Sequence, residues 1–458
     1  MYLENVKASQ SLQSRQPGSR RYAIIGAGAS GICAARELQR LGYDDITIYE
    51  IGSKIGGLWC VHNDNQRSAC YETLHINTPR EHTTFSELPF DDSVSMFPSH
   101  NDMYSYLQRY VEHFGIMRYI KFNSRVVDLS PNGDGRWKIT TESGECDVFD
   151  RIIVGAGHLS TPRHASEIKD RFTGEYLHSF NYKAPAPFVG KRVCVVGAGN
   201  SAFDISCDIC MTAKRTVLVA RSGITIAPKF IFGHPYRDIT IKFEKPWIPE
   251  RFRRWLGKTL TWVVHGDISK LGFKKPERRS HNASSPTLVN HIAYRRVEVK
   301  QGIDSIEGQK ITFVDGATEE FDTVICATGY HIDFPFISPD LLPVKDNFVD
   351  LYKRIVAPDM PGVYFIGYLN TSIGLFRAFE RQTQFMAAFE SGAAVLPSPD
   401  EMRADIENKK AWLLKTYYNT PRHTIEEPHV PYFAELREAV VEGQKRAARQ
   451  PKKVAAHV

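Results

Sequence analysis

Residues 22–31 read YAIIGAGASG, a short apolar run that leads directly into glycines at positions 26, 28 and 31. The pattern predicts a strand, a tight turn and a helix to about residue 41, followed by a second strand, ITIYE, at 46–50. In such a unit the glycines allow the turn itself, close approach of the backbone to a pyrophosphate, and close packing of the helix on the strand. We therefore expect a dinucleotide to bind at this turn.

An acidic residue, Glu50, ends the second strand, 19 residues after Gly31. A carboxylate there can accept hydrogen bonds from ribose hydroxyls and repels a 2′-phosphate, so the site suits FAD or NAD and disfavours NADPH. Because this unit opens the fold, FAD is the preferred occupant. The residues assigned to the FAD site from this unit are Gly26, Gly28, Ser30, Gly31 and Glu50.

The same pattern recurs in the middle of the chain. RVCVVGAGNSA places Gly197 and Gly199 between a predicted strand and a predicted helix, with Ala202 as the third small residue, and TVLVA is the second strand. Here the strand is followed by Arg221 and Ser222 instead of an acid. A guanidinium and a hydroxyl suit a 2′-phosphate, which favours NADPH. The alternative is that Arg221 is a solvated charge at the end of a strand.

Asn200 and Ser201 begin the second predicted helix and are expected beside the phosphates or the nicotinamide ribose. The two units predict an α/β fold with two Rossmann-like dinucleotide-binding domains, the NADPH domain inserted into the FAD domain. Residues 225–300 show no clear pattern. The expected division is a flexible leader (1–20), an FAD-binding domain with a C-terminal helical part (21–164 and 326–442), an NADPH-binding domain (165–325) and a basic tail (443–458).

The composition is that of an ordinary globular chain, with 42% hydrophobic and 24% charged residues among 458. The net charge of +6 lies at the ends: residues 1–21 carry +3 and residues 443–458 carry +5, which leaves −2 for the body. We therefore expect solvated basic tails and no nucleic-acid partner. No apolar run reaches about 18 residues and no signal peptide is recognisable, so no membrane anchor and a cytoplasmic location are expected.

A segment between the two units, residues 172–183, reads FTGEYLHSFNYK. It is similar to the fingerprint F-x-G-x-x-x-H-x-x-x-(F/Y)-K of the flavin-containing monooxygenases, which the chain resembles over about residues 22–395. Tyr182 and Lys183 favour the members that oxygenate nitrogen or sulfur, because the Baeyer–Villiger sister group typically carries Trp followed by Pro or Asp there. His178 is expected to be a packed linker histidine.

Further motifs carry the same resemblance. GGLW at 56–59 resembles a segment that runs beside the flavin, and YETLHINTP at 71–79 resembles the next segment, whose asparagine lies at the oxygen-reacting face. ATGY at 327–330 resembles a strand end that links the two domains. The residues that the resemblance assigns to cofactor binding are Gly57, Leu58, Trp59, Asn77, Thr78, Val126, Ala327, Thr328, Gly329 and Gln382.

The resemblance implies a flavoprotein monooxygenase that depends on NADPH and O2. NADPH would reduce FAD, the reduced flavin would form a C4a-hydroperoxyflavin with dioxygen, and one oxygen atom would pass to an amine or a sulfide. Asn77 is the candidate catalytic residue, because an amide can hydrogen-bond the cofactor or the peroxide without supplying a strong acid. The membrane-anchoring tail of the mammalian members has no counterpart, so a soluble, microbial-type member is expected, with a homodimer as the family-based expectation.

Three alternatives stay open. A Baeyer–Villiger monooxygenase acting on ketones shares the fold and both cofactors. A flavin disulfide reductase needs a close cysteine pair beside the flavin, whereas the only such pair, Cys207 and Cys210, lies in the second unit and is expected to be buried thiols, with no metal site. A non-enzymatic flavoprotein would show no NADPH-dependent oxygen uptake. The substrate itself is not named by the sequence.

Overall fold

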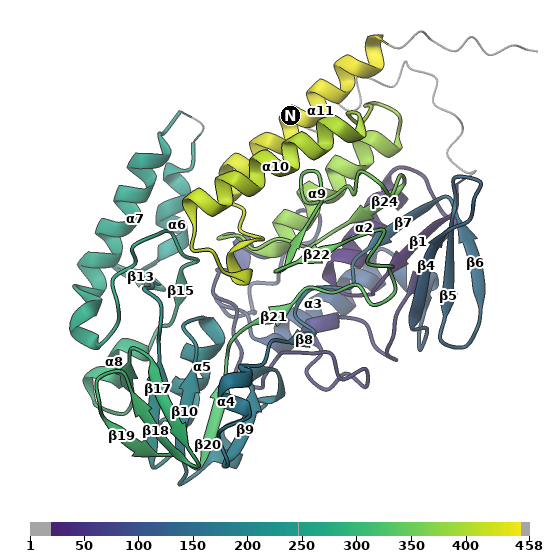
Figure 1. Ribbon diagram of the computed structural model, residues 1–458. Helices are drawn as coiled ribbons and strands as arrows, with labels where there is room; N and C mark the ends of the chain where they lie inside the picture. Colours follow the sequence, from purple (N-terminus) through teal and green to yellow (C-terminus); the bar gives the residue numbers. More distant parts are fainter. Residues whose placement is uncertain (1–19, 246, 450–458) are drawn as a thin grey trace, which may run out of the picture.

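Two parallel sheets organise the fold in the computed structural model, which describes residues 20–245 and 247–449. Figure 1 shows the first sheet toward the right and the second at the bottom. The first sheet has the order β24-β7-β1-β2-β3, and the second has the order β16-β11-β10-β20-β9. Their strands are β24 Val363–Phe365, β7 Arg151–Val154, β1 Tyr22–Ile25, β2 Ile46–Tyr49 and β3 Ile120–Lys121, then β16 Glu298–Lys300, β11 Arg215–Val219, β10 Arg192–Val196, β20 Thr323–Cys326 and β9 Glu175–His178.

Each sheet is built on one of the glycine-turn units. β1 pairs in parallel with β2 and leads into helix α2 (Ala29–Arg40), while β10 pairs in parallel with β11 and leads into α5 (Asn200–Ile209). All strands of the second sheet fall, in sequence, between β7 and β24 of the first. The α/β class with two Rossmann-like units, one inserted into the other, is therefore confirmed.

The first sheet is covered on both faces, which explains why β1 reads as a continuous apolar run. Helices α2, α3 (His100–His113) and α9 (Leu375–Glu390) share one hydrophobic core with it. The other face packs against the antiparallel sheet of β4 (Val126–Pro131), β5 (Trp137–Thr141) and β6 (Cys146–Phe149). Strands β3 and β4 are only a few residues apart in the sequence but belong to different sheets.

The second sheet is also sandwiched. Helices α5 and α8 (Leu288–Ala293) share a core with one face. The antiparallel sheet of β17 (Ile303–Glu307), β18 (Lys310–Phe313) and β19 (Thr318–Glu320) packs on the other. Shorter elements complete the chain: α4 Ser166–Lys169, β8 Thr161–Pro162, β12 Ile226–Ala227, β13 Phe230–Ile231, β14 His234–Pro235, β15 Ala283–Ser284, β21 Tyr330–His331, β22 Val344–Lys345 and β23 Phe348–Val349.

Two C-terminal helices, α10 (Pro399–Thr416) and α11 (His429–Arg449), lie across the top of the molecule in Figure 1. The first residues of the expected basic tail, 443–449, belong to α11. The helix continues there because Gly443 packs against Ala394 and Phe389, and Arg446 donates a hydrogen bond to the carbonyl of Val395 (3.0 Å). Residues 450–458, and residues 1–19 of the expected leader, lie outside the described residues.

The region 225–300, which the sequence left unassigned, contains α6 (Tyr236–Thr240) and a 16-residue helix, α7 (Glu250–His265). None of the residues of helix α7 is buried. Over residues 20–245 and 247–449, no helix has the length and apolar character needed to cross a membrane.

Candidate active site

Two of the three glycines in the first turn leave no room for a side chain. Gly26 has a φ of +103°, and a Cβ there would lie 2.7 Å from the carbonyl oxygen of Gly155. A Cβ at Gly31 would collide with the carbonyl oxygen of Gly26, whereas a Cβ at Gly28 would approach only the Cα of Gly57, at 3.8 Å. The turn therefore combines a left-handed backbone, tight helix–strand packing and an open backbone face, as a pyrophosphate site requires.

Glu50 is 3% exposed and holds this turn from the side. Its carboxylate accepts hydrogen bonds from the backbone N–H groups of Ala27 (2.8 Å) and Gly52 (3.0 Å) and from the side-chain amide of Asn65 (3.3 Å). Burial raises the pKa of Glu50, and these hydrogen bonds oppose the rise. Since a carboxylate has about four acceptor sites, one remains for a ribose hydroxyl beside the turn.

The helices that follow the two glycine turns begin without a side-chain cap. Gly28 precedes α2 and Gly199 precedes α5, and neither helix has a capping side chain or an acidic residue in its first turn. In contrast, α3 and α10 begin with capping boxes built on Ser99 and Ser398. The N–H groups and positive dipole ends of α2 and α5 are therefore available to phosphates.

The second glycine turn is closed from behind by the end of β20. A Cβ at Gly197 would collide with the carbonyl oxygen of Ala327, and the N–H of Ala327 donates to the carbonyl of Val196 (2.8 Å). Ala202 is fully buried, so it satisfies the close packing for which the first unit uses a glycine. The segment 327–329, assigned to cofactor contact by resemblance, thus lies against the back of the turn.

Three arginines gather near this second turn. Nη1 of Arg422 donates to the carbonyl of Ala198 (3.3 Å), directly on the turn. Burial lowers the pKa of Arg163 and of Arg422. The guanidinium of Arg221 lowers the pKa of Arg163 further. At Arg422 the carboxylate of Glu426 opposes the fall, and Arg163 adds to it. Three positive charges held near one another fit an anionic ligand such as the phosphates of NADPH.

Arg221 and Ser222 both lie exposed just after β11. Within residues 20–245 and 247–449, Arg221 forms no ion pair through its guanidinium, in contrast to Arg215 at the other end of the strand, which pairs with Glu319 (2.9 Å). An exposed guanidinium beside a hydroxyl matches the needs of a 2′-phosphate.

A single cavity of about 1540 Å³ is lined by both units. Gly26, Gly28 and Glu50 line it from the first unit, and Asn200 and Ser201 line it from the second. Pockets for drug-sized ligands measure about 300–1,000 Å³. The cavity is larger than one such pocket and has room for parts of two nucleotides, which is what a hydride transfer between them needs.

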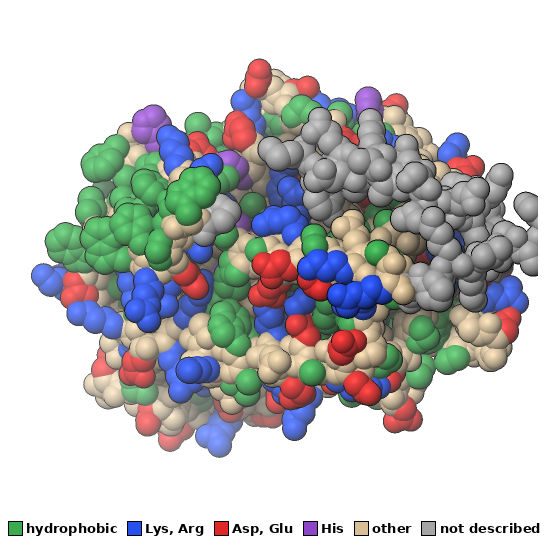
Figure 2. All heavy atoms as spheres, turned by 90° about the horizontal axis from the view of Figure 1, so that it is seen from above, with side chains coloured by type: hydrophobic (Ala, Val, Ile, Leu, Met, Phe, Trp, Pro, Cys, Tyr) green, Lys and Arg blue, Asp and Glu red, His purple; other side chains and the backbone are tan. Residues whose placement is uncertain are grey.

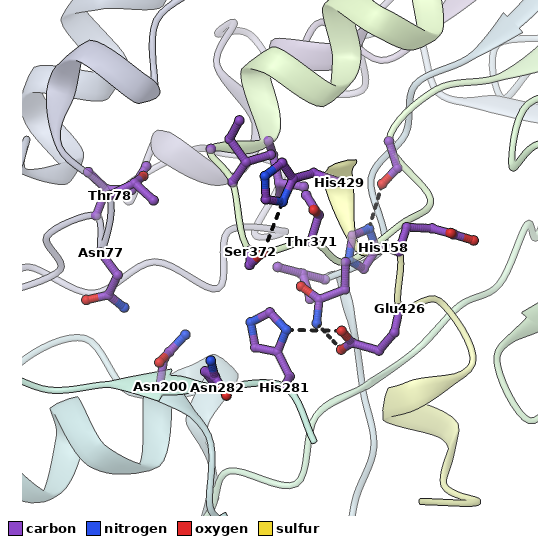
Figure 3. A pocket seen from close by; sticks show the side chains of 18 of the residues that line it. Asn77, Thr78, His158, Asn200, His281, Asn282, Thr371, Ser372, Glu426 and His429 are labelled. Atoms are coloured by element: carbon purple, nitrogen blue, oxygen red, sulfur yellow. Dashed lines mark hydrogen bonds and ion pairs between the residues drawn. The ribbon is translucent and has the colours of Figure 1, made fainter. Parts of the chain in front are cut away.

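Asn77 points into this cavity from the 71–79 loop (Figure 3). Asn200, the first residue of α5, lies across from it, and the Oδ1 atom of Asn200 accepts a hydrogen bond from the N–H of Ser284 (2.9 Å). The hydroxyl of Thr78 turns back to the hydroxyl of Thr83 (2.7 Å), which holds the loop in place. Asn77 is therefore at the point where the two units meet.

The residues assigned from the sequence divide into two sets. Those that line the cavity are Gly26, Gly28, Ser30, Glu50, Gly57, Leu58, Trp59, Asn77, Thr78, Val126, Asn200 and Ser201. Those that do not line it are Gly31, Gly197, Gly199, Arg221, Ser222, Ala327, Thr328, Gly329 and Gln382. Most of the second set build or close the two turns. Arg221 and Ser222 follow the carboxyl end of β11, an interior strand of the second sheet.

Gln382 acts from behind the cavity. It is fully buried, its Oε1 accepts a hydrogen bond from the N–H of Gly367 (2.9 Å), and its Nε2 donates to the hydroxyl of Tyr432 (2.9 Å). Gly367 lines the cavity, and its carbonyl accepts a hydrogen bond from Nδ1 of His158 (3.0 Å). Burial lowers the pKa of His158 to about 4. Gln382 therefore holds Gly367 in place from behind the cavity.

The fingerprint residues tie the loop that carries Asn77 to the second unit. Nζ of Lys183 donates to the carbonyls of Ser68 (2.7 Å) and Cys70 (2.9 Å), just before that loop. Burial lowers the pKa of Lys183. The hydroxyl of Tyr182 is hydrogen-bonded to a carboxylate on α5. The fingerprint is thus a structural link between the two nucleotide-binding units.

Three residues from the sequence analysis do not line the cavity. His178 is 1% exposed and burial lowers its pKa to about 4, so it is packed as expected, but it ends strand β9 of the second sheet and does not lie in a linker. Cys210 is buried as expected, whereas Cys207 is half-buried, and burial raises the pKa of Cys207 to about 12, so it is a poor thiolate. In the part of the chain that the structure describes, no cluster of His, Cys, Asp and Glu could hold a metal.

Sequence reasoning missed a polar cluster on the cavity wall (Figure 3). Glu426 accepts a hydrogen bond from the amide of Asn370 (2.7 Å) and lies 3.2 Å from Nδ1 of His281. Glu244 lies 2.7 Å from Nε2 of His429. Burial raises the pKa of Glu244, but hydrogen bonds, first of all with His429, bring it down to about 2. These residues come from distant segments, so no local pattern marks them, and the same holds for Arg163 and Arg422.

Comparisons with known proteins give relatives that span nearly the whole chain. The family model described as "Flavin-binding monooxygenase-like" matches residues 19–446. Flavin-containing monooxygenase 5 of Cavia porcellus is 30% identical over 449 residues, which cover 92% of this chain and 83% of that protein. The structure of S-allyl-L-cysteine S-oxygenase from Allium sativum has a TM-score of 0.70 at 25% identity and covers 95% of this chain and 94% of that chain.

A second solved structure supports the fold alone. Cyclohexanone monooxygenase from Rhodococcus sp. Phi1, bound to NADP+, has a TM-score of 0.68 at 15% identity. The match covers 94% of this chain and 99% of that chain. The arrangement of two sheets is therefore shared beyond the relatives with clear sequence similarity.

Proposed function

The chain belongs to the flavin-binding monooxygenase-like family, and we propose that it transfers one oxygen atom to a soft nucleophile, either the nitrogen of an amine or the sulfur of a sulfide. As a member of this family it is an enzyme that uses FAD, NADPH and O2. One observation carries the proposal for this chain. The two uncapped glycine-turn helices, α2 and α5, begin beside one cavity into which Asn77 points.

The residues present fit both nucleotides. The first turn offers an open backbone face with Glu50 beside it. At the second turn the guanidinium of Arg422 lies over Gly199, 3.4 Å from the position of a Cβ, and donates to the carbonyl of Ala198. The chemistry that FAD supplies when bound is acceptance of a hydride from NADPH and activation of dioxygen. For a sulfide, the overall reaction consumes the sulfide, O2, NADPH and one proton, and it yields the sulfoxide, NADP+ and water.

The chain's own task is to position the nucleotides and to keep protons and water away from the reacting end. The Asn77 amide has an acceptor oxygen and a donor NH2 group but no acidic proton. We propose that it hydrogen-bonds the reacting end without supplying the acid that would release hydrogen peroxide. Lys183 supports this role indirectly, because it holds the carbonyls of Ser68 and Cys70 just before the Asn77 loop.

A Baeyer–Villiger reaction on ketones is the second candidate, favoured by the fold likeness to cyclohexanone monooxygenase. Tyr182 and Lys183 favour heteroatom oxygenation, since the sister group typically has Trp followed by Pro or Asp there. The name of the Allium sativum relative, an S-oxygenase of S-allyl-L-cysteine, points the same way toward a thioether. Homodimer formation and a cytoplasmic location stay predictions.

The test compares three substrate classes on the FAD-loaded protein. NADPH and O2 consumption are measured with a thioether, a tertiary amine and a cyclic ketone, and hydrogen peroxide is measured in the same samples. We expect the thioether or the amine to give product nearly equal to the NADPH consumed. Product from the ketone alone would replace the proposal with the Baeyer–Villiger reaction.

A further inference from the structure

Helix α7 (Glu250–His265) presents large apolar side chains to solvent. None of its 16 residues is buried, whereas α9, also of 16 residues, buries nine. Phe252 is 43% exposed, Trp255 is 59% exposed and Trp262 is 64% exposed, and Trp247 just before the helix is 76% exposed. Isolated apolar residues on a surface are common, but three exposed tryptophans on one short segment require an explanation.

These residues form one stripe along the helix. Phe252, Trp255 and Trp262 are spaced i, i+3 and i+10, so they project from the same side. Gly257 and Thr261 project from the opposite side and line the cavity. Figure 2 shows hydrophobic side chains gathered at the left, on the side where α7 lies in Figure 1. We call Trp247, Phe252, Trp255, Trp262 and Val263 the α7 patch.

Basic residues run beside the α7 patch. Arg251, Arg254 and Lys258 are exposed and are spaced i, i+3 and i+7, which makes a second stripe next to the aromatic one. These three residues also line the cavity, so the basic stripe lies at its rim, between the aromatic stripe and the cavity. The only acidic residue of the helix is Glu250, in its first turn. A helix with Trp and Phe on one side and Lys and Arg beside them is suited to lie in the headgroup region of a bilayer, with its aromatic rings at the acyl boundary.

We propose that the α7 patch docks on the surface of a membrane that contains anionic phospholipids. This inference goes beyond the proposed function and does not depend on which substrate is oxygenated. Each tryptophan would insert its ring below the headgroups, and the basic stripe would pair with headgroup phosphates. Because the other side of α7 lines the cavity, docking would bring one wall of the cavity next to the bilayer.

Charge distinguishes a lipid surface from a second copy of the chain. In a symmetric dimer through this face, the same patch of both subunits would meet. Arg251, Arg254 and Lys258 would then lie close to their own copies, which is repulsive unless acids intervene, and the helix has only one. An anionic lipid surface complements the basic stripe instead.

Vesicle binding of the full-length, FAD-loaded protein tests the proposal. The protein is sedimented with vesicles of phosphatidylcholine that contain phosphatidylserine, and in parallel with vesicles of phosphatidylcholine alone. We expect binding to the anionic vesicles that weakens with added salt. The double variant Trp255→Gln/Trp262→Gln should bind them roughly tenfold or more weakly. The control Val189→Gln/Val314→Gln, which changes exposed apolar residues elsewhere, should bind like the wild type.

Two further measurements keep the result decisive. Neither Trp255 nor Trp262 lines the cavity, so the double variant should keep its flavin content and its NADPH oxidation rate in solution. Brominated phosphatidylcholine in the anionic vesicles should quench the tryptophan emission of the wild type. The proposal is overturned if the wild type does not bind the anionic vesicles, if the tryptophan variant binds them equally well, or if sedimentation velocity shows a wild-type dimer that the tryptophan variant abolishes.

Discussion

Replacing Arg221 with alanine tests the assignment of the second unit to NADPH. The side chain is exposed at the end of β11, and its charge is close enough to lower the pKa of Arg163. If its guanidinium binds the 2′-phosphate, the variant loses a charge-assisted hydrogen bond, which contributes about 1.5–3 kcal/mol. Because the site is exposed, the lower end applies, and the KM for NADPH should rise about tenfold.

The assay is steady-state oxidation of NADPH and of NADH by FAD-loaded protein. Only NADPH carries the 2′-phosphate, so the KM for NADH should barely change in Arg221→Ala. Lys214→Ala is the matched control, since Lys214 is an exposed basic residue just before the other end of β11. Equal effects on both cofactors would rule out the 2′-phosphate role, and no effect on either would show that Arg221 is a solvated strand-end charge.

Four further predictions test the site. Gly26→Ala should lose FAD, measured as flavin absorbance per protein, because its Cβ would lie 2.7 Å from a backbone carbonyl, while Gly133→Ala, with a positive φ but open space, keeps it. Lys183→Met should lower the thermal midpoint, since removing donors to buried carbonyls costs about 1–3 kcal/mol. Asn77→Ala should keep FAD and NADPH oxidation but divert electrons to hydrogen peroxide; unchanged product per NADPH would contradict this. The pKa of Glu244 lies at about 2, against an ordinary value of 4.5. The ionised carboxylate therefore stabilises the folded state above pH 4.5, and this stabilisation is lost as the pH falls toward 2. Denaturation curves of Glu244→Gln should show a free energy of unfolding lower by about 3 kcal/mol at neutral pH, with a smaller difference at low pH.

The two nucleotide-binding units could be predicted because their signals are local. A glycine with positive φ, a small residue where helix meets strand, and a polar residue after the second strand all fall within about 30 residues of one another. Gly26, Glu50 and Gly197 are therefore placed as expected. Asn77 came from family resemblance and not from its own neighbourhood, and the structure places it in the cavity between the units.

The rest of the cavity wall depends on tertiary packing that no local pattern encodes. Arg422 and Glu426 lie between α10 and α11. Arg422 contacts the second glycine turn and Glu426 contacts His281, and both of these partners are distant in the sequence. The hydrogen bond between Gln382 and Gly367 likewise joins a helix to a separate strand end and follows from packing. Helical spacing does not tell which face of a helix is buried, so the structure alone shows that the aromatic stripe of α7 faces solvent.

In the proposed reaction, NADPH bound at the second unit reduces FAD bound at the first, in the cavity that the two units share. The most direct measurement is anaerobic mixing of the FAD-loaded protein with NADPH, followed by addition of O2 and a thioether. We predict rapid loss of the oxidised flavin absorbance, and then one sulfoxide formed for each NADPH consumed. A flavin that stays oxidised under anaerobic NADPH, or one that returns all its electrons as hydrogen peroxide with every amine and sulfide tried, would contradict it.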